Sequence, residues 1–242
     1  MLNLGSFSSF FIANWKLNGN FKFIEHFISN LTLPLDNSKC IVICPSIIHL
    51  DYMSRVKSGF YLGAQNVSEH VDGAFTGEIS SDSLLDLNIN FCIVGHSERR
   101  QLYFEKDKEI RTKSQNLINN NIIPIVCIGE TLEEKKSGLT FKILETQLNN
   151  SIPNCANFEN TIIAYEPVWA IGTGLTPTNQ EIEDTHHYIR EHNVKYKKFK
   201  IIYGGSVKAD NAKEIISLPN VDGALIGGAS LKSEEFTKII QY

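Results

Sequence analysis

The sequence lacks an excess of positive charge, a long apolar run and a basic leader. Its 23 Lys and Arg against 27 Asp and Glu give a formal net charge of −4, so no general attraction to nucleic acid or an anionic membrane is expected. No apolar run approaches the roughly 18 residues that a membrane helix needs. A signal peptide would carry Lys or Arg near its start, whereas the first ten residues contain neither. We therefore expect a soluble cytoplasmic protein with no nucleic-acid or membrane partner.

Cysteines are few, and segments that could separate domains are missing. The chain has five cysteines, an odd number, and four of them lie in or beside apolar runs rather than in ligand pairs. This pattern predicts reduced, mostly buried thiols. No Pro/Gly/Ser linker, composition shift or low-complexity segment divides the chain, so we expect a single domain spanning residues 1–242.

Short apolar, β-branched runs recur along the whole chain. They cover residues 10–13, 40–44, 60–64, 91–94, 122–128, 161–165, 200–203 and 223–226. The runs are continuously apolar, which is typical of strands covered on both faces. Amphipathic segments of helical period separate most of them, at 21–31, 106–118, 141–152, 179–193, 209–218 and 234–240. Eight such units match the size of a closed (β/α)₈ barrel of parallel strands with outer helices. An open, doubly wound sheet also fits the pattern.

Unusual polar residues and glycines follow the ends of these predicted strands. They are Asn14 and Lys16, His96 with Ser97 and Glu98, Glu166, Gly204-Gly205-Ser206 and Gly227-Gly228. In a barrel all of them lie on the C-terminal rim, where barrel enzymes assemble their sites. One glycine pair would suggest an ordinary turn. Two neighbouring pairs with Lys16 predict a phosphate site, because backbone N–H groups approach phosphate closely where no side chain intervenes.

Glu166 and His96 have the residue types needed for acid–base chemistry. A glutamate at the end of a buried strand is costly as structure and useful as a base. Ser97 and Glu98 could cap a short helix after His96, and a helix N-terminus disfavours the imidazolium, which leaves a neutral hydrogen-bond donor. Together with Lys16 and the glycines, they indicate proton abstraction beside a carbonyl in a small phosphorylated sugar.

Other residues favour less specific explanations. His186, His187 and His192 lie in a predicted helix without the spacing of a zinc site, so we expect an exposed helix face and no metal. The lysines at 195–200 are weak evidence for nucleic acid. Cys127 is expected to pack behind the site, since no base is predicted beside it. The charged run at 133–136 is expected to be a solvated helix end.

Seven motifs occur in order and resemble the triosephosphate isomerase family, a TIM-barrel family. They are NWKLNG at 14–19, GAFTGEIS at 73–80, GHSERR at 95–100, CIGET at 127–131, AYEPVWAIGTG at 164–174, YGGSV at 203–207 and DGALIGGASL at 222–231. The resemblance implies interconversion of dihydroxyacetone phosphate and glyceraldehyde 3-phosphate without a metal or organic cofactor. A neutral histidine near a helix N-terminus is a known feature of this family.

The resemblance also implies a role for each matching residue. Glu166 would be the base, His96 the neutral electrophile, Lys16 the electrostatic stabiliser, and Asn14 a residue that orients substrate. Ser97 and Glu98 would support them. The phosphate would be held by the backbone N–H groups of Gly172, Ser206, Gly227 and Gly228.

The family's closing lid resembles residues 167–177, including Pro167, Trp169, Gly172, Gly174 and Pro177. Where many relatives carry Ala, this chain has Pro177, which has no N–H to donate to Tyr203. We therefore expect a different lid equilibrium.

A second matching loop implies a homodimer. Residues 65–78, including Gln65, Phe75 and Thr76, resemble the loop that inserts into a neighbouring subunit beside its Asn14, Lys16 and His96. A self-packed surface loop is the alternative. Two rival functions also stay open: another phosphate-binding barrel enzyme, and a catalytically silent scaffold relative. The joint presence of Asn14, Lys16, His96 and Glu166 argues against both.

Overall fold

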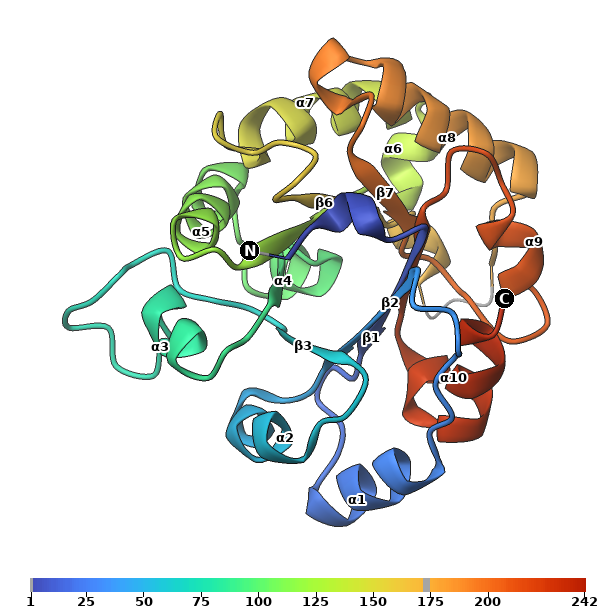
Figure 1. Ribbon diagram of the computed structural model, residues 1–242. Helices are drawn as coiled ribbons and strands as arrows, with labels where there is room; N and C mark the ends of the chain where they lie inside the picture. The colour runs from blue at the N-terminus through green and yellow to red at the C-terminus, as the bar shows by residue number, and fades with distance from the viewer. Residues whose placement is uncertain (1, 172–174) are drawn as a thin grey trace.

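Eight parallel strands form one closed barrel in the computed structural model, which describes residues 2–171 and 175–242 (Figure 1). The strands are β1 (Ser9–Asn14), β2 (Lys39–Cys44), β3 (Tyr61–Ala64), β4 (Phe91–Val94), β5 (Ile123–Ile128), β6 (Ile162–Tyr165), β7 (Lys200–Tyr203) and β8 (Gly223–Ile226). Each strand pairs with the next, and β8 pairs with β1, where Phe10 lies opposite Gly223. This pairing confirms the predicted (β/α)₈ barrel and excludes the open, doubly wound sheet.

Helices surround the barrel and cover its outer face (Figure 1). They are α1 (Phe21–Asn30), α2 (Leu50–Val56), α3 (Ser81–Asp86), α4 (Ser97–Leu102), α5 (Asp107–Asn119), α6 (Leu132–Lys136), α7 (Thr140–Ser151), α8 (Asn179–Glu191), α9 (Ala212–Ile216) and α10 (Ser233–Ile240). Short 3₁₀ turns are η1 (Leu4–Ser6), η2 (Ile47–His49), η3 (Val168–Ala170), η4 (Val194–Tyr196) and η5 (Gly228–Leu231). Within the described residues, no helix is long and apolar enough to cross a membrane.

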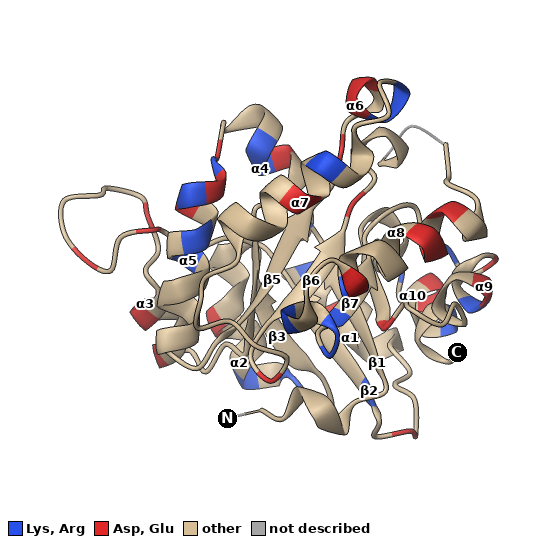
Figure 2. Ribbon diagram, turned by 90° about the horizontal axis from the view of Figure 1, so that it is seen from above, with Lys and Arg blue, Asp and Glu red and all other residues tan. Residues whose placement is uncertain are grey.

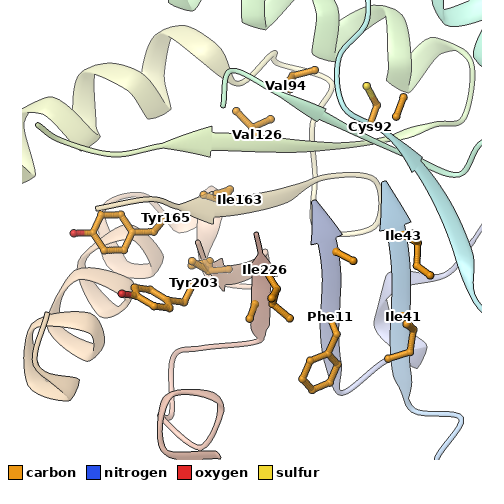
Figure 3. Close-up of a cluster of buried hydrophobic side chains, with 14 of the residues drawn as sticks. Phe11, Ile41, Ile43, Cys92, Val94, Val126, Ile163, Tyr165, Tyr203 and Ile226 are labelled. Atoms are coloured by element: carbon orange, nitrogen blue, oxygen red, sulfur yellow. The ribbon is translucent and has the colours of Figure 1, made fainter. Parts of the chain in front are cut away.

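The strands carry two layers of core side chains, because alternate residues point to opposite faces. Phe10 and Ile12 of β1 belong to the cluster inside the barrel, whereas Phe11 and Ala13 belong to the larger cluster that also contains the buried side chains of the helices. Figure 3 shows part of this outer cluster, including Phe11. Both faces of every strand are therefore apolar, which explains the continuous apolar runs in the sequence.

The N-terminal segment closes the bottom of the barrel. Leu4 of η1 is fully buried, and Phe7 packs edge-on against Phe10 and Tyr61 at ring-centroid distances of 5.7 and 6.0 Å. In Figure 1 this segment, at the blue end of the chain, crosses in front of the barrel. Its apolar side chains thus belong to the inner core, and the opposite end of the barrel is left for the polar residues.

One expectation about an individual residue is corrected. His186 was expected on an exposed helix face, but it is fully buried, and burial lowers its pKa to about 3. Its ring packs against Tyr165 and Tyr203 because it shares the inner face of α8 with Ile182 and Ile189. The charged run at 133–136 forms a solvated helix end, as expected. It belongs to α6, a separate short helix that begins with a capping box of Thr131 and Glu134.

Candidate active site

The polar residues predicted at the strand ends lie together at the C-terminal end of the barrel. Asn14 is the last residue of β1, His96 lies two residues after β4, and Glu166 directly follows β6. All three and Lys16 line one cavity of about 510 Å³. The connections after β7 and β8 line it as well, through Gly204 to Lys208 and Gly227 to Ala229. The structure therefore brings the predicted catalytic residues and the predicted phosphate loops into one site.

Glu166 is buried and makes two hydrogen bonds through its carboxylate. Its Oε1 atom lies 3.0 Å from Nε2 of His96, and its Oε2 atom accepts from the backbone N–H of Ser97 at 3.0 Å. Burial raises the pKa of Glu166, but His96, the Ser97 N–H and the charge of Lys16 together lower it further, to below its usual range. The carboxylate is therefore ionised at neutral pH, as a base must be.

Two glycines leave the space that Glu166 occupies. A Cβ atom on Gly204 would lie 2.8 Å from Cγ of Glu166, and one on Gly129 would lie 1.7 Å from its backbone oxygen. Neither position tolerates a side chain without moving the glutamate. Gly129 is a residue whose role the sequence did not reveal, although it belongs to the quoted motif at 127–131.

His96 begins α4 and caps it. Its Nδ1 atom accepts a hydrogen bond from the backbone N–H of Glu98 at 3.2 Å, so Nδ1 carries no proton and the neutral ring carries its proton on Nε2, toward Glu166. From the sequence we expected Ser97 and Glu98 to cap this helix. That detail is wrong because the histidine ring fills the capping position, but the ring does lie at the helix N-terminus as expected.

The pKa of His96 is raised, whereas we expected the helix N-terminus to disfavour the charged ring. Burial is the largest influence and lowers the pKa, but the charge and hydrogen bond of Glu166, with the charge of Glu98, raise it by more in total. The contact with Glu166 was not foreseen from the sequence. Apart from Glu166, burial and the charge of Lys16 favour the neutral ring, whereas the charge of Glu98 favours the charged one.

Lys16 has a left-handed backbone conformation, with φ of 52°. This conformation is uncommon for a residue with a side chain, and the surrounding hydrogen bonds hold it. Asn14 Oδ1 accepts from the Lys16 backbone N–H at 3.2 Å, and Gln65 Nε2 donates to the Lys16 carbonyl at 2.9 Å. The Nζ atom lies 2.6 Å from Oε1 of Glu98. The lysine ammonium group is thus aimed at the cavity from a fixed backbone.

Comparison with known proteins identifies the family of this site. The sequence profile named "Triosephosphate isomerase" matches residues 9–242. The chain belongs to the triosephosphate isomerase family. A triosephosphate isomerase of Francisella tularensis subsp. mediasiatica is 44% identical over 239 residues, which cover 95% of this chain and 94% of the relative. Triosephosphate isomerases of Francisella philomiragia and Psychromonas ingrahamii are 41% and 40% identical, over 95% of this chain and 94% and 96% of the relatives.

In this triosephosphate isomerase family member, a buried carboxylate fixes the start of the predicted lid. Trp169, in η3, donates from Nε1 to Oε1 of Glu130 at 2.8 Å, and the hydroxyl of Tyr165 donates to the same carboxylate at 3.2 Å. Lys135 Nζ lies 3.6 Å from the centroid of the Trp169 ring. Glu130 was missed from the sequence because its partners are distant along the chain. Gly172 and Gly174, predicted in the phosphate site and lid, lie outside the described residues.

The end of the predicted lid leads directly into α8. Pro177 is buried and directly precedes Thr178, which caps α8 together with Glu181. The hydroxyl of Tyr203 is buried, and no hydrogen-bond partner for it occurs in the part of the chain that the structure describes. The Ser206 hydroxyl donates to the carbonyl of Ala170 at 3.0 Å, which links the connection after β7 to the start of the predicted lid.

A second cavity, of about 520 Å³, opens on the other side of Lys16 and His96. Gln65, Glu98 and Tyr103 are among its lining residues. The loop between β3 and α3, which contains Phe75 and Thr76, projects away from the barrel in both views (Figures 1 and 2).

Two further expectations from the sequence concern Cys127 and the binding of a metal ion. Cys127 is fully buried beneath Glu166, and burial, followed by the charge of Glu166, raises the pKa of its thiol well above the usual range. The expectation that it packs behind the site is confirmed, but its reason, that no base lies beside the thiol, is wrong, because Glu166 does. The thiolate is nevertheless strongly disfavoured. Within residues 2–171 and 175–242, no group of three or more His, Cys, Asp or Glu side chains is arranged to hold a metal ion.

Proposed function

We propose that this chain interconverts dihydroxyacetone phosphate and D-glyceraldehyde 3-phosphate by proton transfer through an enediolate. The observation that carries this proposal is the ionised carboxylate of Glu166, buried 3.0 Å from a histidine whose other nitrogen is already a hydrogen-bond acceptor. A base beside a hydrogen-bond donor is what abstraction of a proton next to a carbonyl requires. Membership of the triosephosphate isomerase family supports the substrate class.

The proton transfers follow from the positions of these groups. The substrate carbonyl enters where His96 now contacts Glu166, so that Nε2–H donates to the carbonyl oxygen and the carboxylate faces the neighbouring carbon. Glu166 removes the proton from that carbon, and the released electron pair forms the carbon–carbon double bond of the enediolate. Lys16 stabilises the negative oxygen, and Asn14 orients the substrate. After His96 moves the proton between the oxygens, Glu166 returns its proton to the adjacent carbon.

We place the substrate phosphate against the loops after β7 and β8. Ser206, Gly227 and Gly228 line the cavity, and their backbone N–H groups would bind the phosphate there. Since η5 begins at Gly228, its N-terminus would add positive potential. Gly172, outside the described residues, would add an N–H from the lid. A closed lid excludes water, which protects the enediolate from phosphate elimination. The proposed reaction consists of proton transfers alone and uses no cofactor.

We also propose that the chain acts as a homodimer. Phe75, at the tip of the projecting loop, is 42% exposed and stacks on His70 at 3.6 Å, so a preformed apolar tip faces solvent in a single chain. The second cavity, beside Lys16 and His96, can receive this tip with Thr76 from a second copy. Leu17 and Tyr103, which line that cavity, are also largely exposed. Association would cover these exposed side chains and would hold Lys16 and His96 in position.

A cytoplasmic location and a single domain fit the same proposal. A triose phosphate is an intermediate of cytoplasmic sugar metabolism. In addition, all five cysteines are free thiols, and four of them are buried. The barrel elements run from β1 to α10 with no separate unit among the described residues.

A coupled assay for conversion of glyceraldehyde 3-phosphate tests the function. Glu166→Gln removes the base and keeps the side-chain size, so the rate should fall by at least about 10² to 10⁴, or roughly 3 to 5 kcal/mol of transition-state stabilisation. Glu145→Gln, a change of an exposed glutamate on α7, is the matched control and should keep full activity. An inactive parent chain would favour a silent scaffold or another phosphate-binding enzyme, and an unchanged rate in Glu166→Gln would refute the role of the glutamate.

A further inference from the structure

Two lysines line the same cavity as Glu166 without taking part in the proposed proton transfers. Lys208 lies two residues beyond Ser206, in the connection after β7, and Lys232 directly precedes α10. Both are exposed at the mouth of the cavity. Among the described residues, neither has an acidic partner within ion-pair distance. Both ammonium groups are therefore available to a ligand.

The floor of the cavity, in contrast, carries little net positive charge. The Lys16 ammonium lies 2.6 Å from the carboxylate of Glu98, which balances its charge. Glu166 adds a negative charge beside them. Glu235 also lines the cavity, and its Oε1 atom is engaged by the backbone N–H of Ala209 at 2.9 Å. Since the whole chain has a formal net charge of −4, attraction of an anion must come from local groups.

We propose that Lys208 and Lys232 are specificity-determining residues that draw the phosphate dianion into the cavity and favour phosphorylated over neutral trioses. This inference rests on the proposed function, because it concerns the same cavity and substrate class. The two lysines come from the same connections that supply the phosphate-binding N–H groups, so their charges act on the phosphate end and not on the reacting carbons. Their exposure makes the effect dependent on salt, since charges separated by more than about 10 Å are screened at 0.1 M.

The expected effect is on capture and not on chemistry. Electrostatic attraction raises association rates by roughly 10 to 10³ in total, so two lysines can account for a modest part of it. We expect each of Lys208→Gln and Lys232→Gln to lower kcat/KM for glyceraldehyde 3-phosphate about two- to fivefold at low salt, and the double variant about tenfold. The difference in kcat/KM between each variant and the parent chain should shrink toward zero at about 0.5 M salt, and kcat should change less than about twofold.

The experiment compares these variants with a charge-matched control. Lys213→Gln removes an exposed lysine from α9 that does not line the cavity, so it should leave the salt dependence unchanged. Unphosphorylated D-glyceraldehyde serves as a neutral substrate, and its kcat/KM should be the same in every variant. Inhibition by inorganic phosphate should weaken in step with the loss of kcat/KM. Lys208→Arg keeps the charge and should retain most of the parent activity. If Lys208→Gln folds poorly, Lys208→Arg serves as the test in its place.

The outcomes separate this inference from the proposed function. If the lysine variants lose kcat/KM equally for the neutral triose, or if their loss persists at high salt, the lysines have a structural role and their role in attracting the phosphate is overturned. Equal effects of Lys208→Gln and Lys213→Gln would also overturn it. If the parent chain fails to isomerise the phosphorylated triose, the proposed function fails, while phosphate binding measured by calorimetry still decides whether the two lysines hold an anion.

Discussion

The contact between Gly204 and Glu166 allows the position of the base to be tested without changing the base. In Gly204→Ala the new Cβ atom would lie 2.8 Å from Cγ of Glu166 and 3.2 Å from the carbonyl oxygen of Tyr165. Ordinary contact begins at 3.4 Å, so the glutamate must move by about 0.6 Å, which is 3.4 minus 2.8. Because a misplacement of about 1 Å costs roughly 10²-fold in rate, we expect kcat to fall about tenfold to 10²-fold.

Steady-state kinetics in both directions would measure this effect. KM and inhibition by inorganic phosphate should change little, because the phosphate loops at Ser206 and Gly228 do not contact the added methyl group. A thermal melt followed by circular dichroism provides the control for folding. If kcat of Gly204→Ala stays within about twofold of the parent while the protein is folded, the position of Glu166 does not limit the reaction and the reasoning is refuted.

Three further changes test other parts of the structure. Lys113→Met leaves the buried Glu105 with fewer cations and should lower the free energy of unfolding in urea by about 2 to 4 kcal/mol. The exposed control Lys108→Met should change this free energy little. Equal effects of the two variants would contradict the reasoning. His186 is neutral when folded, with a pKa of about 3, but binds a proton below pH 6.5 when unfolded, so stability falls as pH drops from 6.5 to 3, by up to about 4 kcal/mol. His186→Phe should flatten that part of the pH–stability curve, and an unchanged slope would refute the assignment. Pro177→Ala restores a backbone N–H at the second hinge and should change the lid opening rate in relaxation-dispersion experiments; equal rates would count against our expectation.

The strands were predictable because both of their faces are buried. In β4, for example, Phe91 and Ile93 belong to the inner cluster and Cys92 and Val94 to the outer one, so the whole run is apolar and its bounds match the prediction. The other predicted strands agree to within one residue at each end. Parallel closure then places every strand end on one rim, which is why the main site residues could be found together.

Short helices and long-range contacts were not predictable in the same way. The six residues of α4 have no apolar period, and their helix depends on the cap by His96 and on pairing of Arg99 and Arg100 with later acidic residues. Glu130 gives no local signal, since its partners come from β6 and η3. His186 could have been assigned correctly, because Ile182 and Ile189 lie four residues before and three after it on the same helix face.

Closure of the barrel between β8 and β1 has a consequence for how activity is acquired during folding. Glu166 and His96 follow β6 and β4, whereas the phosphate loops follow β7 and β8, and Lys16 follows β1. An intermediate that ends at β6 would hold the base beside the histidine but could not retain the substrate. Pairing of the first and last strands has the longest sequence separation of the strand pairs in the barrel, so it is expected to form late. Recovery of isomerase activity after dilution from denaturant therefore reports when β8 pairs with β1, independently of helix formation.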